Sequence, residues 1–255
     1  MKRICFITIF ILYAMVLPVQ AFTFSDNFNR ADSSVVGNGW NEYMYDSGGF
    51  SGVVNNQLKI DNGTNEGIGD NFVYYDLGTT LDSAVVSGVF STNVTGSTFY
   101  IGINATTAEI TRGNAYWWYT YGKGYGMGIG HPSFTYYILD KNGRIGNTSV
   151  LKTGPCSLVA NQRYEFEMLY GNDKSLEVRL WTEGSSRPEN PTFFYTPGTI
   201  PQFTGTNLAI GVSDEGSLTL DNLLVTTQVV PEASTIFAIA IGFLGFVMVK
   251  IKRSF

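Results

Sequence analysis

Two neighbouring segments are the clearest indication of the fold: Tyr164–Tyr170 reads YEFEMLY, and Leu176–Trp181 reads LEVRLW. Apolar and polar side chains alternate in both, which is the two-residue period of a strand with one buried face. A three-residue loop over 172–174 places Glu167 opposite Arg179 and sets the apolar sides of both strands on one face. A two-residue loop would oppose apolar to charged side chains, so we predict an antiparallel hairpin closed by the longer loop.

The same pattern continues along the chain on both sides of the hairpin. Short runs rich in β-branched and aromatic residues are separated by Gly, Asn, Asp and Ser at intervals of about 8–12 residues. No stretch between residues 22 and 228 keeps a helical period over three turns. We therefore expect an all-β domain over 22–228, built from roughly a dozen strands as a two-sheet antiparallel jelly-roll sandwich. Clear examples of these runs are Gln57–Asp61, Phe72–Leu77, Ala84–Ser91, Thr98–Asn104 and Leu218–Thr226.

The two ends of this domain carry distinctive sequences. It opens with Phe24–Asp32 (FSDNFNRAD) and Gly37–Trp40 (GNGW), and it closes with Leu220–Val225 (LDNLLV). These segments resemble the first and last strands of bacterial laminin-G-like and concanavalin-like jelly rolls, and the resemblance implies that the two strands pair as neighbours. That fold hosts lectins, adhesins, glycoside hydrolases and polysaccharide lyases, so it does not settle the function.

The same resemblance implies a structural Ca²⁺ on the convex side, between the first and last strands. Asp221 matches the usual aspartate ligand, and Asp26 lies on the expected partner strand. Calcium takes six to eight oxygen ligands, and the others would be backbone carbonyls. The alternative is that Asp221 caps a strand or accepts a hydrogen bond from a backbone amide.

The N-terminus carries the pattern of an export signal. Lys2 and Arg3 precede the apolar run Ile4–Leu17, and Val19 and Ala21 occupy the −3 and −1 positions of a cleavage after Ala21. This order predicts a secretory signal peptide over residues 1–21. The alternative is an N-terminal anchor that is not cleaved.

The C-terminus combines a helix breaker, one apolar span and a basic end. Pro231, Glu232 and Ala233 precede Ile236–Val249, a run of 14 apolar residues, and two lysines and an arginine follow. This order resembles the PEP-CTERM sorting signal of Gram-negative bacteria, although Ala233 stands where that signal has its second proline. Since the run is shorter than the roughly 20 residues of a comfortable span, it suits an anchor that is held briefly and then cut. An ordinary C-terminal anchor is the alternative.

The resemblance implies a route for the whole protein. Residues 229–255 would hold it in the inner membrane by a single transmembrane helix, with the basic end in the cytoplasm. An exosortase-type processing enzyme would be the partner there, and the family is linked to exopolysaccharide production. The final place would be the cell surface or the extracellular matrix.

Charge and cysteine content exclude several classes of function. Five of the 16 basic residues lie in the two end segments but only one of the 21 acidic residues does, which leaves the domain with a net charge of −9. Such a domain is poorly suited to nucleic acid or to an anionic membrane surface, and its acidity is compatible with neutral sugars or cations. Cys156 is the single cysteine after signal cleavage, so the mature chain forms no internal disulfide.

The sequence offers little for catalysis. His131 is the only histidine, and it lies in the turn-like segment Gly128–Pro132, which excludes a zinc site built on several histidines. Glycoside hydrolysis needs two carboxylates flanking one bond. The segment Glu165–Tyr170 resembles the Glu-x-Asp-x-x-Glu strand of jelly-roll endoglucanases, but it has Glu167 for the aspartate and Tyr170 for the last glutamate. We therefore expect a protein that is not an enzyme, with a polysaccharide-active hydrolase or lyase as the third choice.

The strongest binding candidate is the aromatic segment Tyr116–Tyr121, which reads YWWYTY. In a strand its rings alternate between faces, and Trp117, Tyr119 and Tyr121 share one face. Together with Tyr100 from a neighbouring strand, they form the predicted carbohydrate-binding set, because stacked rings accept the apolar face of a sugar. The alternative is that the rings fill the core and that loops cover the second face.

These observations favour an exported, anchored or processed surface or matrix protein that binds extracellular polysaccharide without catalysis. A structural or adhesive coat protein without a soluble ligand is the alternative.

Overall fold

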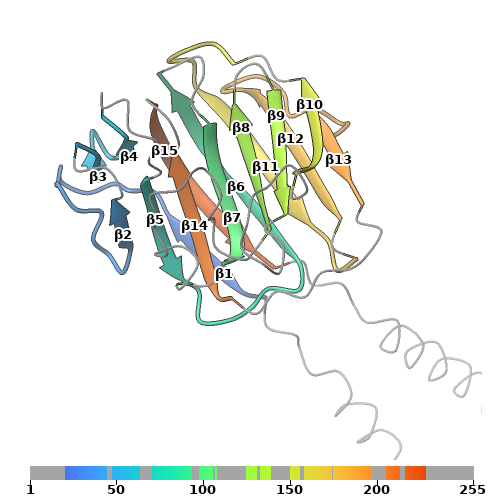
Figure 1. The fold of residues 1–255 in the computed structure, drawn as a ribbon, viewed down its shortest axis with the longest axis horizontal. Coiled ribbons are helices and arrows are strands. Elements are labelled where there is room, and N and C mark those ends of the chain that lie inside the picture. Colours follow the sequence, from blue (N-terminus) through green and yellow to red (C-terminus); the bar gives the residue numbers. More distant parts are fainter. Residues whose placement is uncertain are drawn as a thin grey trace, which may run out of the picture. The chain divides into compact units, whose positions relative to one another are not determined.

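Two antiparallel β-sheets pack face to face between Thr23 and Thr227 and enclose the core between them (Figure 1). The predicted two-sheet antiparallel sandwich is therefore confirmed. The computed structural model describes residues 21–44, 48–63, 71–93, 98–105, 107, 125–130, 133–138, 150–155, 158–173, 175–196, 205–212 and 216–227.

The eight-stranded sheet has the order β13-β12-β11-β6-β15-β4-β3, with β1 added alongside β15. β1 pairs antiparallel with β15 over four residues, so the expected neighbourhood of the first and last strands is confirmed. The strands are β1 (Thr23–Asp26), β3 (Phe50–Val54), β4 (Gln57–Asp61), β6 (Ala84–Thr92), β11 (Tyr164–Tyr170), β12 (Leu176–Thr182), β13 (Phe193–Tyr195) and β15 (Ser217–Thr226).

The seven-stranded sheet has the order β10-β9-β8-β7-β14-β5-β2. β7 and β14 lie next to each other near its centre, and β14 also pairs with β5, which is followed by β2. The strands are β2 (Asn41–Met44), β5 (Asn71–Asp76), β7 (Thr98–Ala105), β8 (Tyr125–Gly130), β9 (Ser133–Ile138), β10 (Val150–Pro155) and β14 (Asn207–Val212).

The hairpin of β11 and β12 has the predicted register. Glu167 pairs with Arg179, and their side chains form an ion pair with 3.3 Å between Oε1 and Nη1. The loop closes where the Gly171 amide donates to the Ser175 carbonyl at 2.9 Å, which leaves three residues between them. All the inward positions of β11 are buried, so local alternation alone placed this hairpin correctly.

Rings from both sheets meet in the core between them. Phe90 of β6 lies 4.9 Å from Phe99 of β7, centroid to centroid, and Phe166 of β11 lies 6.1 Å from Phe99. Both sheets therefore turn apolar faces inward, which leaves each with one outer face.

A bulge in β15 changes which side chains point inward. Asp221 pairs with Val89 but Leu224 pairs with Ser87, and Asn222 takes a left-handed φ of 51°. Because of the extra residue, Leu220 before the bulge and Leu223 after it are both buried.

The predicted export and sorting segments largely lie outside the described residues. Of the predicted signal peptide, only Ala21 is described, and Pro231, Glu232 and Ala233 are not. Within the described part of the chain, no helix has the length and hydropathy needed to cross a membrane.

Candidate functional site

The outer face of the seven-stranded sheet is identified by strand alternation. Phe99 and Ile101 of β7 are buried in the core, so Tyr100 between them belongs to the other face. Tyr100 pairs with Gly211 of β14, and Gly211 pairs in turn with Phe72 of β5. This row continues to Tyr43 of β2, and the next row contains Tyr74, Ala209 and Gly102.

This surface, called the aromatic face below, has rings above a floor of small residues. Tyr43, Tyr74 and Tyr100 are half-buried and pack on a cluster of the buried residues Phe72, Ala105 and Ala209. A Cβ built on Gly211 would lie 2.3 Å from two carbons of the Phe72 ring, so the ring lies directly on the glycine backbone. The residues that define the aromatic face are Tyr43, Phe72, Tyr74, Tyr100, Gly102, Ala209 and Gly211.

The aromatic face of β2, β5, β7 and β14 carries almost no charge. Among the described side chains that point outward from these four strands, only Asp76 is charged, at the very end of β5. Its Oδ1 accepts the Gly78 amide at 2.8 Å. Hydrogen bonds from Thr206 and Gly78 hold the pKa of Asp76 below its usual value. The described part of this face therefore presents rings rather than ionised groups.

The predicted carbohydrate-binding set is only partly within the described structure. Tyr100 lies on the outer face, as the alternation required, whereas Trp117, Tyr119 and Tyr121 lie outside the described residues. Tyr43 and Tyr74 were not predicted from the sequence, and the strand register brings them to the same face. The alternating run of β5 was the available signal, but its rings could be assigned to this face only after β5 was paired with β14.

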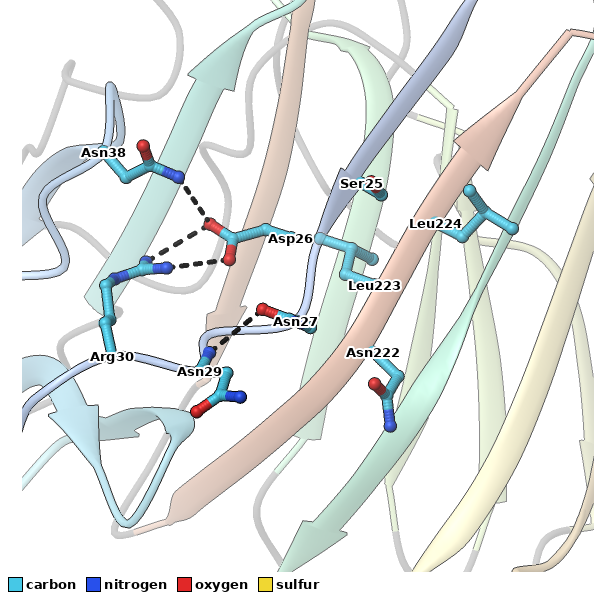
Figure 2. A pocket seen from close by; sticks show the side chains of 9 residues that line it. All are labelled: Ser25, Asp26, Asn27, Asn29, Arg30, Asn38, Asn222, Leu223 and Leu224. Atoms are coloured by element: carbon cyan, nitrogen blue, oxygen red, sulfur yellow. Dashed lines mark hydrogen bonds and ion pairs between the residues drawn. The ribbon is translucent and has the colours of Figure 1, made fainter.

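A second feature is an open polar pocket of about 670 Å³ where β1 leaves the edge of the eight-stranded sheet (Figure 2). Amide side chains dominate its lining, and we call it the amide pocket. It is lined by Ser25, Asp26, Asn27, Asn29, Arg30, Asn38, Asn222, Leu223 and Leu224.

Asp26 is the buried anchor of the amide pocket. Its Oδ1 accepts from Nη1 of Arg30 and from the Phe28 amide, both at 2.8 Å. Its Oδ2 accepts from the Trp40 indole at 2.9 Å, from Nη2 of Arg30 at 3.2 Å and from the Asn38 carboxamide at 3.5 Å. Figure 2 shows the guanidinium and the Asn38 amide converging on this carboxylate.

Burial and hydrogen bonding act on Asp26 in opposite directions. Burial alone raises the pKa of the Asp26 carboxyl. Hydrogen bonds from Arg30, Phe28 and Trp40, with the charge of Arg30, outweigh burial and hold this pKa below its usual value. Asp26 is therefore ionised at neutral pH, and its charge is neutralised within the protein.

The predicted pair of calcium ligands does not form one site. Asp26 pairs in register with the buried Leu223 and points inward, with its side chain 3% exposed. Asp221 lies on the other face of the sheet, where its Oδ2 is 3.5 Å from Nη2 of Arg163 and its Oδ1 accepts the Asn222 amide. Within the described residues no cluster of three or more candidate metal ligands occurs. Asp26 also does not fit calcium, because both of its oxygens already accept from cationic or N–H donors.

The carboxylates considered for catalysis lie on the outer face of the eight-stranded sheet, called the charged face below. Glu167 contacts the guanidinium of Arg179 at 3.3 Å and also that of Arg187, and Oε1 of Glu165 accepts the Gly184 amide at 3.1 Å. Glycoside hydrolysis requires two carboxylates that face one substrate bond, whereas these two are engaged within the protein. His131 and Cys156 lie outside the described residues.

Comparison with known proteins supports the fold only. No family model matches the chain, and no curated protein sequence matches it. The exoplasmic/lumenal domain of VIP36 in its Ca²⁺/Man2-bound form is similar with a TM-score of 0.58 at 9% identity, over 83% of this chain and 90% of that one. The carbohydrate recognition domain of Emp46p matches with a TM-score of 0.55 at 9% identity, over 79% of this chain and 95% of that domain.

Two further solved structures show the breadth of this fold. A protein of unknown function from Shewanella oneidensis MR-1 has a TM-score of 0.54 at 12% identity, over 84% of this chain and 91% of that one. A sialidase has a TM-score of 0.54 at 9% identity over 81% of this chain, but the match spans only 18% of the sialidase. The chain therefore has a lectin-like jelly-roll fold.

Proposed function

We propose that this protein is a non-catalytic carbohydrate-binding protein and that the aromatic face is its binding surface. The observation that carries the proposal is the arrangement of Tyr43, Tyr74 and Tyr100 around the buried cluster of Phe72, Ala105 and Ala209. Tyrosine rings stack on the apolar C–H faces of sugars, and their hydroxyls hydrogen-bond to sugar hydroxyls. The buried residues Phe72, Ala105 and Ala209 support the three rings from below, so that the half-buried tyrosines are the groups that would meet a sugar.

The architecture supports the same function. The names of VIP36 bound to Man2 and of the Emp46p carbohydrate recognition domain state that these similar domains recognise carbohydrate. The engaged carboxylates of the charged face favour binding over hydrolysis. Trp117, Tyr119 and Tyr121 are proposed to extend the binding surface beyond the described residues.

The route to the cell surface is part of the proposal. Residues 1–21 direct export, and residues 229–255 anchor the protein in the inner membrane until an exosortase-type enzyme cuts near Pro231, Glu232 and Ala233. The protein then acts at the surface or in the matrix of a Gram-negative bacterium, where an extracellular polysaccharide is its partner.

The test is retention of the full-length protein, in detergent, on columns of neutral polysaccharides, followed by titration with oligosaccharides of the retained polymer. We expect Tyr74→Ala and Tyr100→Ala each to weaken binding by about tenfold, since one lost stacked ring removes roughly 1.5 kcal/mol. Arg187→Ala on the charged face is the matched surface control and retains the affinity of the unmodified protein.

Two outcomes would contradict the proposal. Absence of retention on every polysaccharide would favour a structural or adhesive coat protein. Release of new reducing ends from a polysaccharide would instead show an enzyme.

A further inference from the structure

The amide pocket has the properties of a binding site separate from the aromatic face. It lies at the β1–β15 edge of the eight-stranded sheet, whereas the aromatic face belongs to the other sheet. We propose that the amide pocket is a second ligand site, which takes a neutral, hydroxyl-rich molecule such as the terminal or branching sugar of a glycan.

The polar groups of the pocket are available to a ligand. Within the described part of the chain, the side chains of Ser25, Asn29 and Asn222 make no hydrogen bond, and all three line the pocket. The Asn27 carbonyl oxygen accepts the Asn29 backbone amide at 3.1 Å, which leaves the Asn27 NH₂ group for a ligand. A carboxamide presents a donor and an acceptor side by side, and neighbouring sugar hydroxyls can satisfy both.

The pocket is held in shape before any ligand arrives. Asn222 stands out from the bulge of β15 with a φ of 51°, and Asn38 lies in a turn with a φ of 53°. That turn is closed by the Trp40 amide, which donates to the Gly37 carbonyl at 3.0 Å. Asp26 in turn binds the Trp40 indole at 2.9 Å. Since these groups are ordered already, a ligand loses less free energy to their immobilisation.

The charge of the pocket selects against ionic ligands. Among the described residues that line it, only Asp26 and Arg30 are charged, and they neutralise each other through a two-point ion pair. The domain around the pocket has an excess of acidic residues, which disfavours polyanions. Leu224 is 38% exposed at the rim and offers an apolar surface to the C–H face of a sugar.

The experiment measures sugar binding at the amide pocket after binding at the aromatic face has been removed by substitution. Binding of glucose, galactose, mannose and N-acetylglucosamine is measured by saturation-transfer NMR and calorimetry. The protein is the full-length chain that carries both Tyr74→Ala and Tyr100→Ala. We expect at least one of these sugars still to bind. Adding Asn222→Gly, which keeps the left-handed backbone while removing the carboxamide, weakens that binding by about tenfold. Asn29→Ala is a second variant with the same expected direction.

Asn56→Gly is the matched control, because Asn56 is exposed, has a φ of 60° and lies in the turn between β3 and β4. It leaves the binding unchanged. The proposal is overturned if no sugar binds once both tyrosines are removed, or if Asn222→Gly and Asn29→Ala bind like their parent. If no sugar binds to the variant without the two tyrosines but the unmodified protein binds sugar, the amide pocket is not a site and the proposed function of the aromatic face is retained. If the tyrosine variants bind as the unmodified protein does, the aromatic face is not the main site.

Discussion

The two outer faces of the sandwich use their side chains in opposite ways. On the charged face, Arg179 lies between Glu167 and Glu177, at 3.3 and 3.1 Å. On the aromatic face, Tyr74 and Tyr100 pack on small or buried neighbours. The charged face pairs these charges with each other, whereas the aromatic face presents half-buried rings over an uncharged cluster. The same two-residue alternation therefore produces a charged outer surface on one sheet and an aromatic outer surface on the other.

The largest effect is expected at the floor of the aromatic face. In Gly211→Ala the new methyl would lie 2.3 Å from the Phe72 ring and 3.0 Å from the Asn71 carbonyl oxygen. Phe72 is 5% exposed and has little room to move. We expect a loss of about 2 kcal/mol in the free energy of unfolding, measured by urea denaturation. We also expect sugar affinity to weaken by about tenfold, because the displaced ring pushes on the tyrosines.

Thr219→Val is the control for Gly211→Ala on the opposite face. It removes the hydrogen bond between Thr219 Oγ1 and Ser91 Oγ, 2.7 Å apart, without changing the size of the side chain. Stability falls by about 1 kcal/mol and sugar binding stays the same. If both variants weakened binding in proportion to their stability loss, the distinction between the two faces would be lost.

A smaller effect is expected from the ion pairs of the charged face. Arg179 is 12% exposed and bridges two glutamates, whereas Arg187 is 47% exposed and contacts one of them. Arg179→Ala leaves Glu167 and Glu177 close together without their shared cation, which costs about 1 kcal/mol of stability. Arg187→Ala changes the urea midpoint little, because an exposed pair is weak. Equal losses from both variants would show that burial does not govern this network.

The sequence predicts those parts of the fold that depend on neighbours along the chain. The β11–β12 register followed from the alternation around one short loop, since only one loop length places Glu167 opposite Arg179. The aromatic face could not be assembled in this way. Tyr43, Tyr74 and Tyr100 come together only because β2, β5, β14 and β7 pair across long sequence separations.

Asp26 shows a second limit of the sequence. Asp26 was predicted as a second calcium ligand because it lies on the strand that pairs with the strand of Asp221. The sequence does not show which donors surround its carboxylate. In the structure Phe28 adopts a left-handed φ of 52°, and this turn returns Arg30 to the carboxylate four residues earlier. The guanidinium then supplies the positive charge that was expected from a metal.

The stability of the sandwich and its sugar affinity are expected to depend on pH in different ways. The folded-state pKa values of Asp26 and Glu183 lie below their usual values. Their contribution to stability is therefore present at neutral pH and is lost as the pH falls below about 4, through the folded-state pKa values. We expect the melting temperature to fall between pH 5 and pH 3, and Asp26→Asn to reduce that fall while lowering the melting temperature at pH 7. Sugar affinity stays constant between pH 5 and pH 8, and a titration within that range would place an ionisable group at the binding surface.

The smallest effect is expected for added calcium at the β1–β15 edge, which belongs to neither of the two outer faces. A ligand that binds only the folded state raises the melting temperature as its concentration exceeds its dissociation constant. Both oxygens of Asp26 already accept hydrogen bonds from Arg30, Trp40 and their neighbours, and Asp221 contacts Arg163 on the opposite face. Calcium would have to displace a guanidinium to reach either carboxylate. We therefore expect the same melting temperature in millimolar calcium chloride and in excess EDTA. A rise of several degrees with calcium, abolished by Asp221→Asn, would show that Arg163 gives up its partner to a metal.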